Sequence, residues 1–195
     1  GKRKPPKRWS HKVLKKRLPE NLHYHGIHHT YDVVRAVERI AIMEGVMDDD
    51  IFVLKSAATY HDAGFVEQYD SNEPVGARLA EEILPKYGYT EEQIEEVKKL
   101  IYATIIPHQP NSKLEEIICD ADLDYLGRDD FFQIADTLRR ELRDHGKIKS
   151  DRLWDEIQVK FLTQHQYFTK SAKKMRRVKK QEHLEIIKQK LVDNN

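Results

Sequence analysis

The stretch HYHGIHHTYDVVRAVERIAIMEG, residues 23–45, joins a histidine cluster to a strong helical pattern. Its apolar residues recur at intervals of three and four: Val33, Val34, Val37, Ile40 and Ala41. This spacing places them on one face of a helix, and Gly45 is suited to ending that helix. Four histidines stand at its start: His23, His25, His28 and His29.

Similar helical patterns continue to the end of the chain. They cover 47–64, 74–88, 90–106, 114–127, 129–146, 151–168 and 171–191. Thr90 and Gln93 have the spacing of a capping box at the start of one of these helices. Because no convincing run of alternating strand residues appears, we expect an all-α protein, a single compact multi-helix bundle. The predicted domain covers 19–195 and follows a basic lead-in, 1–18.

The net charge of +1 hides an uneven distribution of charge. Residues 1–17 carry nine Lys and Arg, residues 170–190 carry nine more, and the body, 18–169, has a balance of −14. Basic ends can bind nucleic acid or anionic lipid, or they can be solvated helix faces that dock on the acidic body. The second interpretation is favoured, because neither end interleaves aromatic residues with its basic ones. Nucleic acid is therefore an unlikely partner.

Two further features of the composition concern the protein's location. No apolar run approaches the roughly 18–20 residues that a membrane span requires, so no membrane partner is expected. Cys119 is the only cysteine, which excludes an internal disulfide. The single cysteine predicts a reducing, cytoplasmic setting.

Acidic and imidazole side chains interrupt two of the apolar helical patterns. His61 and Asp62 end a predicted helix in which Leu54, Ala57 and Ala58 are expected to be buried. The stretch IICDADLDYLG places Asp120, Asp122 and Asp124 among apolar residues. Burying such groups is costly unless they are paired or bound to a metal. Taken singly, each is more often a hydrogen-bonded core pair or a turn cap. A helix turns about 100° per residue, so Asp120 and Asp124 share a face while Asp122 points elsewhere.

Three segments taken together carry a family resemblance: YHGIHHTYDVV, LKSAATYHDAGF and ICDADLDYLG. A His, then a His-Asp pair, then an Asp on successive helices resembles the HD-domain superfamily of metal-dependent phosphohydrolases. The resemblance covers roughly residues 21 to 145, and the remaining helices extend the same domain. It implies an all-α fold and a divalent metal that activates water for attack on phosphorus.

The resemblance implies four metal ligands: His29, His61, Asp62 and Asp122. His29 has a core aliphatic residue, Val33, four positions later, and Asp122 is the aspartate that follows Ala121. His28 and His23 match no family position. One metal is expected, since Asn72-Glu73 stands where relatives often carry His-Glu and His108 is the only histidine between Asp62 and Asp122. The donor set allows Mn, Fe, Ni, Co, Zn or Mg.

The resemblance also implies three catalytic residues: His25, Asp62 and Glu73. His25 resembles a histidine that contacts the phosphate or protonates the leaving group, although Gly26 stands where relatives carry Asn. Asp62 would orient or deprotonate the attacking water. Glu73 would handle water, or is simply an acid in the first turn of its helix. Basic residues must also meet the phosphate, and three are near in sequence: Arg78, Lys55 and Arg128.

The leading functional hypothesis is a phosphohydrolase whose substrate is a nucleotide or another small phosphate ester. The alternative is a regulatory HD module that binds metal or nucleotide, without turnover, within a longer signalling protein. An oxygenase holding two irons is a third hypothesis, but it requires more ligands than the chain offers. A homodimer is also possible through an aromatic surface, although residues at such spacing are more often core: Phe131, Phe132, Trp154, Tyr167 and Phe168.

Overall fold

The computed structural model describes residues 14–194, which contain nine α-helices and no strand. The α-helices are α1 (Leu14–Arg17), α2 (Ile27–Met43), α3 (Asp48–Tyr60), α4 (Asn72–Ile83), α5 (Glu91–Ala103), α6 (Lys113–Asp122), α7 (Phe131–Asp144), α8 (Asp151–Gln164) and α9 (Lys170–Asp193). Three 3-10 helices join them: η2 (Ala63–Val66), η3 (Leu84–Tyr87) and η4 (Asp124–Gly127). The predicted all-α class is confirmed, while most of the basic lead-in lies outside the described residues.

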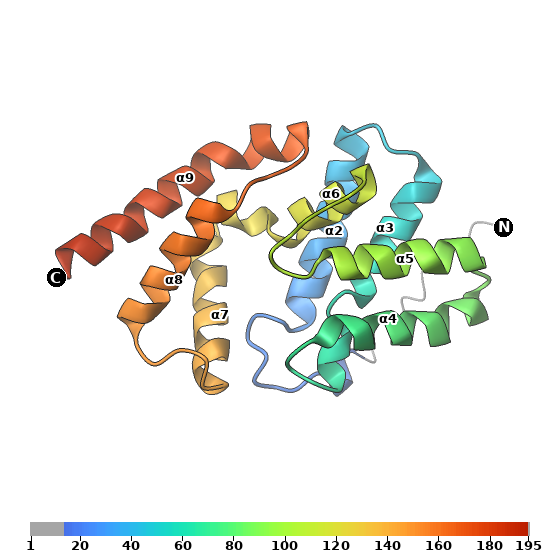
Figure 1. Ribbon diagram of the computed structural model, residues 1–195, viewed down its shortest axis with the longest axis horizontal. Helices are drawn as coiled ribbons and strands as arrows, with labels where there is room; N and C mark the ends of the chain where they lie inside the picture. The colour runs from blue at the N-terminus through green and yellow to red at the C-terminus, as the bar shows by residue number, and fades with distance from the viewer. Residues whose placement is uncertain (1–13, 195) are drawn as a thin grey trace.

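The helices form two groups, each with its own apolar core (Figure 1). In the first group α2 packs on α3 and α6, and α4 packs on α5. The second group contains α7, α8 and α9, with α8 lying along α9 and η4 packed against α9. Fully buried residues of α2, including Val33, Val37 and Ile40, lie at the spacing that the sequence pattern predicts.

One predicted helix start agrees with the structure, while two predicted helices end earlier than expected. Thr90 and Gln93 form the predicted capping box at the start of α5. The stretch 47–64 is one helix only as far as Tyr60, so His61 and Asp62 lie at its C-terminal end rather than inside it. Likewise 114–127 divides after Asp122, where a 3-10 turn follows. Because the regular helices end at Tyr60 and Asp122, the directions of the polar side chains beyond these points do not follow the 100° spacing of a continuous helix.

The acidic segment around Asp122 connects three parts of the fold. On one side the Asp120 carboxylate accepts hydrogen bonds from the Thr169 amide and hydroxyl, each at 2.8 Å, and so holds the start of α9. On the other side the fully buried Asp124 pairs with Arg39 of α2 at 2.5 Å and Arg176 of α9 at 2.9 Å. The neighbouring aspartates are therefore structural, and only Asp122 is directed elsewhere.

The aromatic residues considered for a dimer surface lie mostly inside the protein. Phe131 and Trp154 belong to the second core, and Tyr167 is also buried and donates a hydrogen bond to the Leu123 carbonyl. Only Phe132 is substantially exposed. These residues thus serve packing first, and a homodimer stays a prediction. Among residues 14–194 no helix, including the highly charged α9, is both long enough and apolar enough to cross a bilayer.

Substitution of Gly127 tests whether η4 and α9 pack through close backbone contact. A Cβ atom at this position would lie 2.2 Å from the backbone oxygen of Arg176 in α9. We expect Gly127→Ala to lower the free energy of unfolding by about 2–4 kcal/mol, because α9 or η4 must shift. The measurement is urea unfolding followed by circular dichroism.

Gly146→Ala is the matched control for that variant. Gly146 has φ +67° but open space around a Cβ, so only the left-handed backbone conformation is penalised, by about 1–2 kcal/mol. Equal losses in the two variants would contradict the close packing of η4 on α9.

Candidate metal centre

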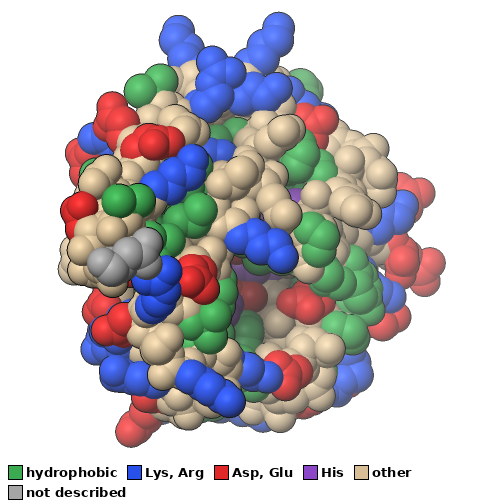
Figure 2. All heavy atoms as spheres, turned by 60° about the vertical axis from the view of Figure 1, so that its left-hand side comes forward, with side chains coloured by type: hydrophobic (Ala, Val, Ile, Leu, Met, Phe, Trp, Pro, Cys, Tyr) green, Lys and Arg blue, Asp and Glu red, His purple; other side chains and the backbone are tan. Residues whose placement is uncertain are grey.

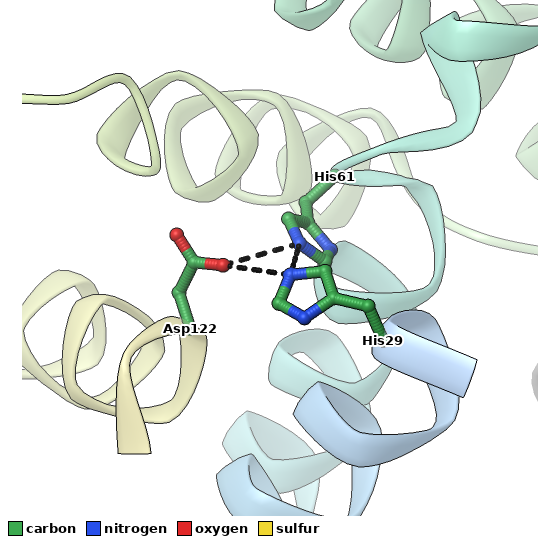
Figure 3. A group of neighbouring side chains, drawn as sticks. All are labelled: His29, His61 and Asp122. Atoms are coloured by element: carbon green, nitrogen blue, oxygen red, sulfur yellow. Dashed lines mark hydrogen bonds and ion pairs between the residues drawn. The ribbon is translucent and has the colours of Figure 1, made fainter. Parts of the chain in front are cut away.

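Three side chains from three helices converge on one point in the interior. His29 comes from the first turn of α2, His61 directly follows α3, and Asp122 is the last residue of α6. The Asp122 Oδ1 atom lies 3.1 Å from His29 Nε2 and 3.4 Å from His61 Nε2, and the two imidazole nitrogens are 3.4 Å apart. Figure 3 shows the three side chains pointing toward one another. One donor atom from each lies within 4.8 Å of the others, close enough to hold a metal ion.

Asp62 adds a second carboxylate beside the same imidazoles. Its Oδ2 atom lies 3.2 Å from His61 Nε2 and 3.4 Å from His29 Nε2. This oxygen is buried and accepts no hydrogen bond from the described part of the chain. A buried carboxylate oxygen without a hydrogen bond costs free energy unless a cation lies beside it. The four sequence-predicted ligand residues are therefore together in space, with a donor set that fits a divalent ion.

Three hydrogen bonds orient the residues of the His-Asp pair. His61 Nδ1 lies 2.6 Å from the Ala58 carbonyl, so Nδ1–H donates to that oxygen and the Nε2 lone pair is directed at the cluster. Asn72 donates from its amide nitrogen to the His61 carbonyl at 3.1 Å and to Asp62 Oδ1 at 3.5 Å. Asn72, in the position where relatives often carry His, thus supports the cluster from α4.

Opposite charges in the cluster shift the titration of its members. Burial alone raises the pKa of Asp62, but the nearby His61, His25 and His29 rings outweigh it and lower the pKa to about 2. Burial lowers the pKa of His61, and the carboxylates of Asp62 and Asp122 reverse that shift and raise it well above its ordinary value. The two carboxylates therefore attract positive charge, which either protons or a metal cation can supply.

His108 belongs to this cluster, although sequence reasoning noted it only as a lone histidine. Its Nε2 atom lies 3.2 Å from Asp122 Oδ2, and its side chain is buried. Its Nδ1 atom is buried and makes no hydrogen bond within residues 14–194. The sequence feature that could have identified His108 is its position in the short loop before the helix that ends in Asp122. His108 therefore either orients Asp122 or adds a further donor.

His25 is held beside the cluster by a residue that sequence reasoning missed. The carboxylate of Glu141, in α7, lies 2.5 Å from His25 Nδ1 and accepts the His25 backbone N–H at 2.8 Å. Tyr69 donates its hydroxyl to the same carboxylate at 2.9 Å. Burial lowers the pKa of His25, but the Glu141 hydrogen bond together with the charges of Asp62, Glu141 and Asp122 outweighs burial, and the pKa is raised. No sequence motif points from residue 141 to residue 25.

The backbone around Gly26, the residue after His25, leaves too little room for a side chain. A Cβ atom at this position would lie 2.8 Å from the Leu22 carbonyl oxygen, so the asparagine common in relatives would require the chain to shift. Of the remaining histidines, His28 is exposed and His23 pairs with Asp144 at 2.8 Å near the surface. The interpretation of His28 and His23 as bystanders stays consistent with these positions.

A cavity of about 440 Å³ opens from the cluster toward α7 and α8. Its polar end includes His25, Asp62, Glu73 and Asp122. Glu73 lies in the first turn of α4 and is half-buried, and burial raises its pKa. Figure 2 shows a face hollowed near its centre, where acidic and hydrophobic side chains gather and a basic side chain lies at the edge.

The basic residues expected to meet a phosphate are absent from this cavity. Arg78 pairs with Glu67 at 2.6 Å and is exposed, and Lys55 pairs with Glu38 at 2.7 Å. Arg128 pairs with Asp32 at 2.7 Å and lines a separate small cavity on another side of His29. That expectation was wrong because ion-pair partners distant in sequence hold these side chains elsewhere.

Comparison with known proteins supplies one match. A family model of the HD domain matches residues 26–124, which contain all four predicted ligand residues together with His108. No curated protein and no solved structure matches the chain. Because the match spans just over half of the chain, this protein belongs to the HD domain family, part of a superfamily of metal-dependent phosphohydrolases.

Proposed function

We propose that this protein is a metal-dependent phosphohydrolase that acts on a nucleotide or another small phosphate ester. The observation that carries the proposal is the convergence of His29, His61 and Asp122 on one point, with Asp122 also lining a cavity. Membership of the HD domain family supports it. A cavity of about 440 Å³ is within the usual size of small-molecule sites.

In this proposal His29, His61, Asp62 and Asp122 hold one divalent metal. A mixed set of imidazoles and carboxylates suits Mn, Fe, Co, Ni or Zn better than Mg, which prefers oxygen ligands. Four protein ligands leave positions for water and substrate on an ion of five or six coordination. When bound, the ion supplies a Lewis acid that activates water and neutralises phosphoryl charge.

The protein's own residues orient the reactants and move protons. Asp62, whose Oδ2 accepts no hydrogen bond from the described residues, orients the attacking water. Glu73 faces the cavity at the same end and is a second carboxylate that can exchange protons with water. His25, whose Nδ1 is held by Glu141, has Nε2 available for the leaving oxygen.

The choice of Asp122 over Asp120 as ligand is tested by metal content. We expect purified parent protein to hold about one metal ion per chain and Asp122→Asn to hold less than about a tenth of that, because a neutral amide is a poor ligand. Asp120→Asn is the control: it should keep the metal and lose about 1–3 kcal/mol of stability, since Asp120 binds Thr169 instead. Equal metal content in the two variants, by plasma mass spectrometry, would contradict the assignment.

Catalysis is tested by stripping the metal and adding Mn, Fe, Co, Ni, Zn or Mg singly. Product release is then measured on p-nitrophenyl phosphate, its bis ester and a panel of nucleotides. We expect at least one metal to restore turnover and Asp62→Ala to lower kcat/KM at least about 100-fold. Asp48→Ala, an exposed acid in the first turn of α3, is the control and should match the parent. The proposal fails if no metal restores turnover and Asp62→Ala equals the parent.

The role of His25 is tested by varying the leaving group. His25→Gln should lower kcat/KM on an alkyl phosphate by about 10²–10⁴, because alkoxide needs a proton, and on p-nitrophenyl phosphate by less than about tenfold. Glu141→Gln should show the same dependence more weakly, since it disturbs only the orientation of His25. Asp144→Asn, which alters the nearby surface pair with His23, should behave as the parent. An equal loss on both substrates would assign His25 a structural role.

A further inference from the structure

The cavity beside the metal centre has one polar end and one apolar wall. The wall is formed by α7 and α8, with Leu138 and Leu142 on the first and Trp154, Ile157 and Phe161 on the second. These helices lie outside residues 26–124, so the wall is not part of the matched family region. Gln158 is the main hydrogen-bonding side chain that α8 contributes to the cavity.

The charge of the cavity lining is negative. Four carboxylates line it, those of Asp62, Asp70, Glu73 and Asp122, and no Lys or Arg among residues 14–194 does. Two of the carboxylates, Asp62 and Asp122, are assigned to the metal and so are neutralised by it. Of the other two carboxylates, Asp70 pairs with Lys147 at 3.2 Å and Glu73 forms no ion pair among residues 14–194. A phosphate beyond the one at the metal would therefore meet Glu73 with no Lys or Arg of the described residues lining the cavity.

We infer that the preferred substrate carries a single phosphoryl group esterified to a bulky, uncharged, largely apolar or aromatic group, which packs against the α7–α8 wall. The inference rests on the proposed function, because the phosphoryl group is placed at the metal centre. Burial of apolar surface on the wall supplies the affinity that cationic side chains supply in polyphosphate sites. Nucleoside di- and triphosphates are then poor substrates.

Binding of phosphonates, which are not hydrolysed, tests the inference without requiring turnover. Isothermal titration of Mn-loaded protein compares methylphosphonate, benzylphosphonate, 1-naphthylmethylphosphonate and 4-carboxybenzylphosphonate. We expect the naphthylmethyl compound to bind at least about tenfold more tightly than the methyl compound, because it buries more apolar surface. The carboxybenzyl compound should bind at least about tenfold more weakly than the benzyl compound, from which it differs by one distal negative charge.

Ile157→Lys places a cation on the wall and should reverse the preference for the benzyl compound over the carboxybenzyl compound. Ile157 lines the cavity and is 39 % exposed, so the lysine can reach solvent and folding is preserved. We expect this variant to bind the carboxybenzyl compound more tightly than the parent does and the naphthylmethyl compound more weakly. Leu153→Lys is the matched control, because Leu153 lies on the same helix, is 37 % exposed and does not line the cavity. It should bind all four compounds as the parent does.

The outcomes separate this inference from the proposed function. Equal affinity for the methyl and naphthylmethyl compounds, tighter binding of the carboxybenzyl compound by the parent, or no phosphonate binding at all would overturn the inference. Phosphonate binding in the expected order by a protein that hydrolyses no phosphate ester with any metal would overturn the proposed function alone. Turnover that favours nucleoside triphosphates would overturn the inference and leave the hydrolase proposal standing.

Discussion

The structure depends on how one short acidic segment is buried. Asp120, Asp122 and Asp124 are all in the interior, and an unpaired buried carboxylate is among the most costly groups a protein can contain. Different groups stabilise each carboxylate. Asp120 accepts hydrogen bonds at the start of α9, Asp124 pairs with arginines of α2 and α9, and Asp122 lies beside the imidazole cluster. The contacts of Asp120 and Asp124 orient the segment so that the Asp122 side chain points to His29 and His61.

This arrangement divides the chemistry between two groups of helices. The segment matched by the HD family, α2 to α6 with their connections, contributes every imidazole and carboxylate of the cluster. The later helices contribute Glu141, which holds His25, and the apolar wall of the cavity. In the proposed function, metal chemistry and substrate preference therefore come from different parts of the chain, and the cavity lies where the two groups meet. Side chains of α7 and α8 can be replaced without touching any of the proposed metal donors.

Sequence reasoning was most successful where the signal is local. Apolar spacing located the helices, and the capping box at Thr90 was confirmed. Helical phase was a poorer guide to the aspartates, because α6 ends at Asp122: Asp120 and Asp124, expected on one face, contact Thr169 on one side and two arginines on the other. Sequence reasoning was least successful for contacts between distant residues. Arg128 was expected at a phosphate but pairs with Asp32, and Glu141 was not considered at all. Such pairings depend on the packing of whole helices, which residue spacing does not encode.

By itself, the sequence determined the helical class, because periodicity is a local property, and its resemblance to the HD domain proposed the residues that would bind a metal. It also pointed to His29, rather than His28, as the histidine on the buried side of α2. Only the tertiary structure decided that His108 joins Asp122, that Glu141 holds His25, and that the cavity is apolar and free of Lys and Arg among the described residues. The physical reason is that burial and Coulomb energy depend on distances in space, which are created only when the two groups of helices pack together.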